Sequence, residues 1–128
     1  PFGRYKTINY VSDFASYQSV LNKWEFSNTD FAQIDIKPND FIYADPPYDV
    51  PFRQYSQQGF DWDDQVRLAE WLANHNGPVV LSNQATDNIK KLYRELGFTL
   101  KFLDAPRTIS CKGDKRQAAR EVLALRGF

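Results

Sequence analysis

The segment Asp45–Tyr48, with the sequence DPPY, carries the most specific set of chemical groups in this sequence of 128 residues. It follows an apolar run, Phe41–Ala44, that predicts a buried parallel strand. Its two prolines cannot continue a strand ladder or a helix interior, so they hold the chain in a stiff turn at the strand's carboxyl end. Ligands bind at that end of open α/β sheets. We therefore expect a carboxylate, a backbone carbonyl and an aromatic ring to be fixed at the mouth of a site.

Those groups suit the activation of an exocyclic amine on a nucleobase, which is a poor nucleophile because its lone pair is delocalised into the ring. Asp45 and the Pro46 carbonyl are both acceptors, and together they can draw the amine toward tetrahedral geometry. Tyr48 can stack on the base, and positioning and electrostatics then supply most of the rate. A base within a duplex must be flipped out to reach this turn. The alternative is a structural turn, in which Asp45 accepts a local hydrogen bond and Tyr48 packs.

The elements around this turn alternate between helix and strand patterns. Upstream, an approximate helical stripe covers Ile8–Leu21, and Trp24–Phe26 is a short strand candidate. Downstream, the predicted elements are a helix that Asp61 caps and Gly77–Pro78 stop, a buried strand at Val79–Leu81, a helix at Asp87–Leu96 closed by Gly97, and a strand at Phe98–Leu103. Residues 118–125 fit either a helix or a strand. This order favours an α/β fold with a largely parallel sheet.

The composition indicates one folded domain. Hydrophobic residues make up 42% of the sequence, enough for a chain of this length to bury a core. Basic and acidic residues balance at 16 each, which argues against an autonomous nucleic-acid-binding domain. The single cysteine, Cys111, excludes an intrachain disulfide and suits a cytoplasmic protein, and one cysteine with one histidine cannot form a zinc site. No apolar run is long enough for a membrane span.

The run Phe41–Tyr48 resembles the catalytic motif of S-adenosylmethionine-dependent amino-methyltransferases. Further motifs are similar, and in the same order, to those of the Dam-type DNA adenine-N6 methyltransferases. They are PFGRYK at residues 1–6, SNTDF at 27–31, VVLSN at 79–83, and a C-terminal hairpin with RTIS at 107–110, Gly113, Lys115-Arg116 and EVL at 121–123. The resemblance implies an α/β, partial Rossmann-like S-adenosylmethionine-dependent methyltransferase fold. Its sheet would be mostly parallel, with a C-terminal antiparallel strand.

The resemblance implies roles for three groups of residues. The catalytic group is Asp45, Pro46, Pro47 and Tyr48. The cofactor, S-adenosyl-L-methionine, would be bound by Asp30, Phe31 and Asp45. Double-stranded DNA would be contacted by Pro1, Arg4, Tyr5, Lys6, Lys112, Lys115 and Arg116. The alternatives are a loop acid beside a core aromatic for the cofactor pair, and solvated basic segments for the DNA group.

The family's glycine-rich cofactor loop and its ribose-binding acid have no counterpart in this sequence, which also contains no methionine. We therefore expect residues 1–9 to be the end of a DNA-recognition region and residues 10–128 the C-terminal part of a catalytic domain, completed by a missing N-terminal segment. The resemblance implies the sheet order 3-2-1-4-5-7-6, of which strands 1 and 2 would be absent. The catalytic strand would then have an open edge. We expect the isolated chain to cover that edge by forming a homodimer, or to leave residues 24–28 out of place, and to be inactive alone.

The sequence thus favours methyl transfer from S-adenosylmethionine to the N6 atom of a flipped-out adenine in duplex DNA. Two alternatives stay open. One is an RNA or guanine-N2 methyltransferase with the same corner, and the other is a non-catalytic nucleic-acid-binding fragment of a split enzyme. Cytosine-N4 enzymes of this kind usually begin the motif with serine and glutamine-methylating enzymes with asparagine, so Asp45 argues against both. Residues 49–60 are expected to form a loop over the site.

Overall fold

The computed structural model describes residues 13–49, 59–105 and 119–128, and the chain divides into two compact units, residues 1–30 and 31–128. In the first unit, α1 (Ala15–Leu21) begins after Asp13, whose carboxylate accepts a hydrogen bond from the Ala15 amide at 2.9 Å. The earlier part of the predicted helix, residues 8–12, lies outside the described residues. The prediction of a strand at residues 24–26 was wrong, because these residues form no regular secondary structure. Their exposed aromatic rings contact only each other among the described rings, and no described strand pairs with them.

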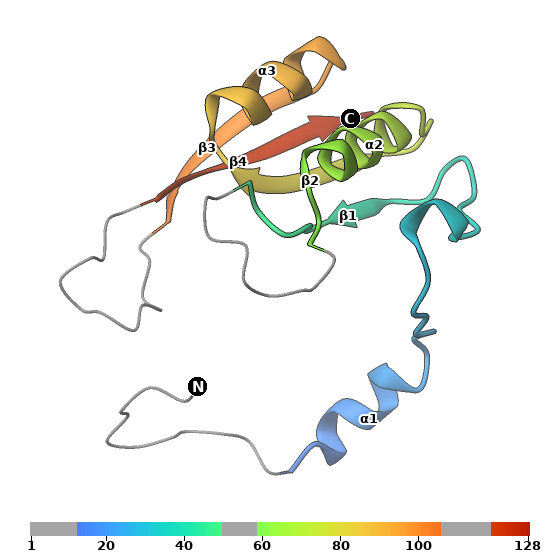
Figure 1. Ribbon diagram of the computed structural model, residues 1–128. Helices are drawn as coiled ribbons and strands as arrows, with labels where there is room; N and C mark the ends of the chain where they lie inside the picture. Colours follow the sequence, from blue (N-terminus) through green and yellow to red (C-terminus); the bar gives the residue numbers. More distant parts are fainter. Residues whose placement is uncertain (1–12, 50–58, 106–118) are drawn as a thin grey trace, which may run out of the picture. The chain divides into compact units, whose positions relative to one another are not determined.

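The second unit is built on a four-stranded sheet in the order β1-β2-β4-β3 (Figure 1). Its strands are β1 (Ile42–Ala44), β2 (Val79–Gln84), β3 (Thr99–Ala105) and β4 (Ala119–Arg126). β1 and β2 pair in parallel, while β4 is antiparallel to both β2 and β3. This order agrees with the 4-5-7-6 portion of the order expected from the resemblance, and it shows that the ambiguous C-terminal segment is a strand.

The sheet is less parallel than predicted. Because β4 inserts between β2 and β3, only one of the three hydrogen-bonded strand pairs is parallel. β1, β2 and β3 nevertheless run in the same direction, since β4 opposes both of its neighbours. The expected antiparallel C-terminal strand is therefore confirmed, and the carboxyl ends of β1 and β2 lie at the same edge of the sheet.

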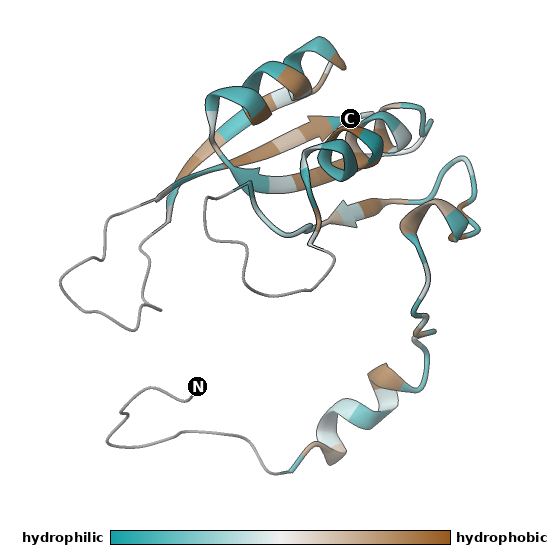
Figure 2. Cartoon of the chain, in the orientation of Figure 1, coloured by the Kyte–Doolittle hydropathy of each residue, from teal (hydrophilic) through white to brown (hydrophobic). Residues whose placement is uncertain are grey.

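Two helices, α2 (Trp62–Ala73) and α3 (Asp87–Glu95), and a short 3₁₀ helix, η1 (Phe31–Gln33), complete the unit. Burial of apolar side chains from α2, α3, β2 and β4 against one another forms a single core. Its members are Leu68, Ala69, Leu72, Val79, Leu81, Ile89, Tyr93, Phe98, Val122 and Ala124. In Figure 2 the strands are largely hydrophobic, while the helices carry both hydrophobic and hydrophilic residues, as expected for helices that pack one face on a core. No helix in the described part of the chain is long and apolar enough to cross a membrane.

Local signals fix where the helices begin and end. Asp61 caps α2 as predicted, in a reciprocal capping box with Asp64, whose amide donates to the Asp61 carboxylate at 3.1 Å. α2 ends at Ala73 instead of at Gly77: the Asn74 amide still bonds to the Glu70 carbonyl, but the next amide, that of His75, bonds to the Leu72 carbonyl in a tighter turn. α3 is closed, as predicted, by Gly97, whose φ of +78° lies in the left-handed region.

Candidate active site

The DPPY segment leaves the carboxyl end of β1 beside β2. Ala44 pairs with Leu81, so Asp45 comes level with Ser82. The Ser82 hydroxyl donates a hydrogen bond to Oδ1 of Asp45 at 2.6 Å and lies 3.2 Å from the Ala44 carbonyl oxygen. Ser82 also hydrogen-bonds to the side chain of Tyr48.

The opposite face of β2 holds the same segment through side-chain amides. The side-chain Nε2 of Gln65, in the first turn of α2, donates to the Pro47 carbonyl at 2.7 Å. The side-chain oxygen of Asn83 accepts a hydrogen bond from the Asp49 amide at 3.0 Å. These two amides are joined directly, since Asn83 Nδ2 donates to Gln65 Oε1 at 2.9 Å. The turn is therefore held from α2 and from both faces of β2.

Two hydroxyl groups from α3 and its N-terminus extend this network. Thr86, the N-cap of α3, accepts a hydrogen bond from the Ile89 amide and donates to the Asp49 carboxylate at 2.9 Å. The phenol oxygen of Tyr93 accepts a hydrogen bond from Asn83 at 3.1 Å. The packing of α3 is thereby linked to the position of the residue that follows the DPPY segment.

Both tyrosines near this corner are neutral at physiological pH. Burial raises the pKa of the Tyr48 phenol above its ordinary value, the Ser82 hydrogen bond partly opposes that rise, and the nearby carboxylates of Glu121 and Asp45 add to it. Burial also raises the pKa of Tyr93, more strongly. An uncharged Tyr48 ring is the form that suits stacking on a base.

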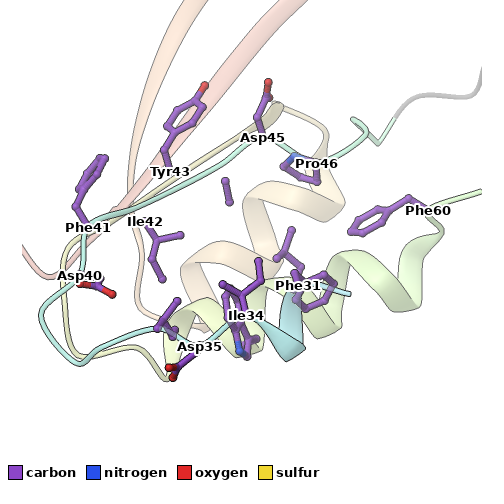
Figure 3. Close-up of a pocket in the computed structure, with 14 residues that line it drawn as sticks. Phe31, Ile34, Asp35, Asp40, Phe41, Ile42, Tyr43, Asp45, Pro46 and Phe60 are labelled. Atoms are coloured by element: carbon purple, nitrogen blue, oxygen red, sulfur yellow. The ribbon is translucent and has the colours of Figure 1, made fainter. Parts of the chain in front are cut away.

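The corner opens onto a cleft of about 630 Å³ (Figure 3). Ile42, Ile34, Phe31 and Phe60 point into it, while Tyr43 and Asp45 project from the other side of β1, as strand alternation requires. Pro46 lies between the two groups, and Asp45 and Pro46 both border the cleft. The described lining contains three carboxylates, Asp35, Asp40 and Asp45, and no lysine or arginine.

Phe31, predicted to contact the cofactor, does line this cleft with Asp45 and Pro46. Its ring lies 5.5 Å from the ring of Trp71, and the guanidinium of Arg67 sits 4.1 Å from its centroid. The structure thus brings Phe31 to the DPPY corner, which lies 14 residues later in the sequence. Asp30 is exposed and belongs to the N-terminal unit.

The residues predicted to contact DNA all lie outside the described residues, as does most of the loop expected at 49–60. Conversely, sequence reasoning missed Gln65, Arg67 and Trp71. Gln65 directly follows the capping box of α2 and is buried. A glutamine on the apolar face of an amphipathic helix needs a hydrogen-bond partner, and that position could have pointed to it. Among the described residues, no group of three or more acidic, histidine or cysteine side chains is arranged to hold a metal ion.

Comparison with known proteins relates this site to one enzyme family. Residues 1–109 match the D12 class N6 adenine-specific DNA methyltransferases. The chain is 33% identical over 135 residues to the DNA N-6-adenine-methyltransferase of Escherichia phage P1, and the match covers 97% of the chain and 18% of the relative. It is 37% identical to the Retron Ec67 DNA adenine methylase of Escherichia coli, with 99% of the chain and 46% of the relative covered.

A third relative, the type II methyltransferase M.MjaIII of Methanocaldococcus jannaschii, is 34% identical, with 91% of the chain and 44% of the relative covered. The chain thus spans less than half the length of each of these three relatives. The family match nevertheless extends over most of the chain and includes the whole DPPY corner. The chain belongs to the D12 class of N6 adenine-specific DNA methyltransferases.

Proposed function

We propose that the chain contributes the catalytic corner of a methyltransferase that modifies the N6 amine of a flipped-out adenine in double-stranded DNA. Residues 10–128 would be the C-terminal part of a Rossmann-like catalytic domain, and residues 1–9 the end of its DNA-recognition region. The family match, the strand order and the position of DPPY at the carboxyl end of a parallel strand support this assignment.

The observation that carries the proposal is the pair of acceptors left available at the corner. Ser82 occupies Oδ1 of Asp45, which leaves Oδ2 for another donor. The Pro46 carbonyl accepts no hydrogen bond from any residue that the structure describes. Two acceptors on adjacent residues match the two N–H groups of one exocyclic amine. Asp45 and Pro46 would thereby localise the nitrogen lone pair, with Tyr48 fixing the plane of the base.

The residues of the cleft fit S-adenosylmethionine as the methyl donor. Phe31, Phe60 and Trp71 offer aromatic surface for a purine ring, and the three carboxylates at the cleft suit a ligand with sulfonium and ammonium groups. When bound, this cofactor supplies an electrophilic methyl group on sulfur. Asp45 then has a second effect, because a carboxylate beside the amine stabilises the positive charge that develops on nitrogen during transfer, until the N6 proton is lost to solvent.

A methylation assay on the protein expressed from its complete reading frame tests this function. The protein is incubated with tritiated S-adenosylmethionine and either duplex DNA or RNA, and the modified nucleosides are separated. We expect N6-methyladenine from DNA, and about a 100- to 1,000-fold loss of rate in Asp45→Ala. Asp63→Ala, an exposed carboxylate in the first turn of α2, is the matched control. N2-methylguanine, or modification of RNA alone, would contradict the proposed substrate.

Cofactor binding is tested separately by titration calorimetry. Stacking on an aromatic ring is worth about 1–3 kcal/mol for a base, so Phe31→Ala should weaken the binding of S-adenosylmethionine by about 5- to 150-fold. The titration is run with and without duplex DNA. Equal affinity for the cofactor in the wild type and in Phe31→Ala would mean that Phe31 has only a packing role, beneath Arg67 and beside Trp71.

A further inference from the structure

The buried polar side chains of the described chain have one thing in common. They are Gln65, Ser82 and Asn83, which are 2%, 2% and 0% exposed. Each of them hydrogen-bonds to the segment Ala44–Asp49. Burying a polar group lowers stability unless it is hydrogen-bonded, so these three side chains depend on the partners that the turn and its neighbours supply. Among the described residues, no buried side-chain polar atom lacks a partner.

The hydrogen bonds of Asn83 determine how its own amide is oriented. Its oxygen accepts from the amides of Asp49 and Gln84, and its nitrogen donates to Gln65 and Tyr93. Reversing the amide would place its nitrogen against the N–H groups of Asp49 and Gln84 and its oxygen against Oε1 of Gln65. With Asn83 fixed in this way, Oε1 of Gln65 must face Asn83. The Nε2 group of Gln65 is then directed at the Pro47 carbonyl.

This arrangement distinguishes between the acceptors of the corner. The turn offers two neighbouring carbonyls, from Pro46 and Pro47, and the two oxygens of Asp45. Gln65 occupies the second carbonyl and Ser82 occupies Oδ1. One carbonyl, that of Pro46, and one carboxylate oxygen, Oδ2 of Asp45, remain as acceptors. Both prolines lack an N–H group, so within the DPPY backbone itself only Asp45 and Tyr48 can donate, and the selection depends on side chains from α2 and β2.

We propose that Gln65, held by Asn83, is a positioning residue that sequesters the Pro47 carbonyl, so that the Pro46 carbonyl and Oδ2 of Asp45 are the two atoms presented to the amine. This inference rests on the proposed function for its catalytic consequence, but the geometry can be tested without activity. Gln65 does not touch the substrate. It acts by fixing the peptide planes of the turn, and a displacement of about 1 Å at such a site can reduce a rate by about 100-fold.

Two substitutions at Gln65 separate a positioning role from a structural one. Gln65→Leu removes the donor to Pro47 and keeps an apolar side chain of similar size. Gln65→Glu keeps the acceptor for Asn83 but sets a carboxylate against the Pro47 carbonyl. When that buried carboxyl is protonated it can donate again, and burial raises its pKa toward neutrality. Asn74→Ala is the matched control, because it removes a side-chain hydrogen bond at the other end of the same helix.

Single-turnover methylation by the protein from its complete reading frame gives the kinetic readout. We expect the rate of the chemical step to fall about 10- to 100-fold in Gln65→Leu, while the Kd for S-adenosylmethionine stays within a factor of about two. In Gln65→Glu the rate relative to wild type should recover as the pH is lowered from 8 to 6. Asn74→Ala should keep the wild-type rate per folded molecule. Rate losses that follow thermal stability equally in all three variants would overturn the proposal.

Nuclear magnetic resonance gives the readout that does not need activity. The Pro47 carbonyl carbon should shift in Gln65→Leu and the Asp49 amide should exchange faster with solvent, with neither change in Asn74→Ala. An unchanged Pro47 carbonyl resonance in Gln65→Leu would overturn the positioning role. If the wild-type protein methylates no adenine, the proposed function fails by that result alone, and the carbonyl resonance still decides whether Gln65 sets the geometry of the turn.

Discussion

β1 and β2 are neighbouring parallel strands, yet their environments are opposite. β2 pairs on both sides, with β1 and with β4, and most of its residues are buried. β1 has only three residues, pairs with no described strand on its outer side, and leaves Tyr43 58% exposed. The DPPY segment follows β1, the weaker strand. Its geometry is nonetheless fixed, because the hydrogen bonds that hold it come from β2 and α2.

The difference shows where the precision of this site originates. An edge strand sets the course of the backbone, but it has too few neighbours to fix the positions of side chains as closely as a functional site requires. The buried neighbour, β2, fixes these positions through hydrogen bonds from Ser82 and Asn83, whose side chains point to opposite faces of the strand. The contacts that hold the DPPY turn therefore all come from β2 and α2, while the outer side of β1 is exposed in the described part of the chain.

The largest expected effect contrasts the two strands directly. Leu81 is fully buried in β2, so Leu81→Ala should lower the free energy of unfolding by about 2–5 kcal/mol. Tyr43→Ala on β1 should lower it by less than about 1 kcal/mol, because the side chain is mostly exposed. Urea denaturation of both variants measures these values. Similar losses in the two variants would show that β1 is packed as tightly as β2.

A second, smaller effect concerns the buried phenol behind β2. Burial raises the pKa of Tyr93, so above pH 10 the unfolded chain loses this proton before the folded chain does. The contribution to stability is complete below about pH 10 and falls by at most about 1.4 kcal/mol per pH unit as the pH rises further. Urea denaturation between pH 8 and 11 should show this slope, and Tyr93→Phe should reduce it. Tyr48→Phe should change it less, because its pKa is raised less. An unaltered slope in Tyr93→Phe would mean that the phenol titrates normally.

Features of the fold with a local cause could be predicted from the sequence. The capping box at Asp61 needs only two carboxylates at the right spacing, and Gly97 closes α3 because glycine adopts positive φ without a steric penalty. The position of DPPY after a parallel strand followed from the apolar run and the two prolines, but the burial predicted for that strand was wrong, since Phe41 and Tyr43 are 60% and 58% exposed. Phe31 lines the cleft with Asp45 and Pro46, a position that no local pattern around residue 31 indicated, and its contact with the cofactor stays a prediction.

Features that depend on tertiary partners could not be predicted. Gln65 lies 18 residues from the carbonyl that it binds, and its direction is set by Asn83, which is 18 residues away on the other side in the sequence. The Trp24–Phe26 segment has strand-like composition, but a strand needs a partner, and composition does not supply one. α2 ended before the predicted Gly77, and the chain leaves the helix at Asn74, whose side chain bonds to the Glu70 carbonyl.

The smallest expected change in stability tests the open edge of the sheet. Tyr43→Lys on β1 should alter the free energy of unfolding by less than about 0.5 kcal/mol, since surface substitutions of this kind are nearly neutral. A lysine on an exposed edge also opposes the pairing of that edge with another chain.

If two copies of the chain pair through β1, the apparent mass of the wild type in sedimentation rises toward that of a dimer with concentration, and Tyr43→Lys stays monomeric. Leu103→Lys is the matched control, because Leu103 is 48% exposed on β3 at the opposite edge. A wild type that stays monomeric at high concentration with an intact sheet would contradict the homodimer. Dissociation by both lysine variants would mean that the contact does not lie on β1.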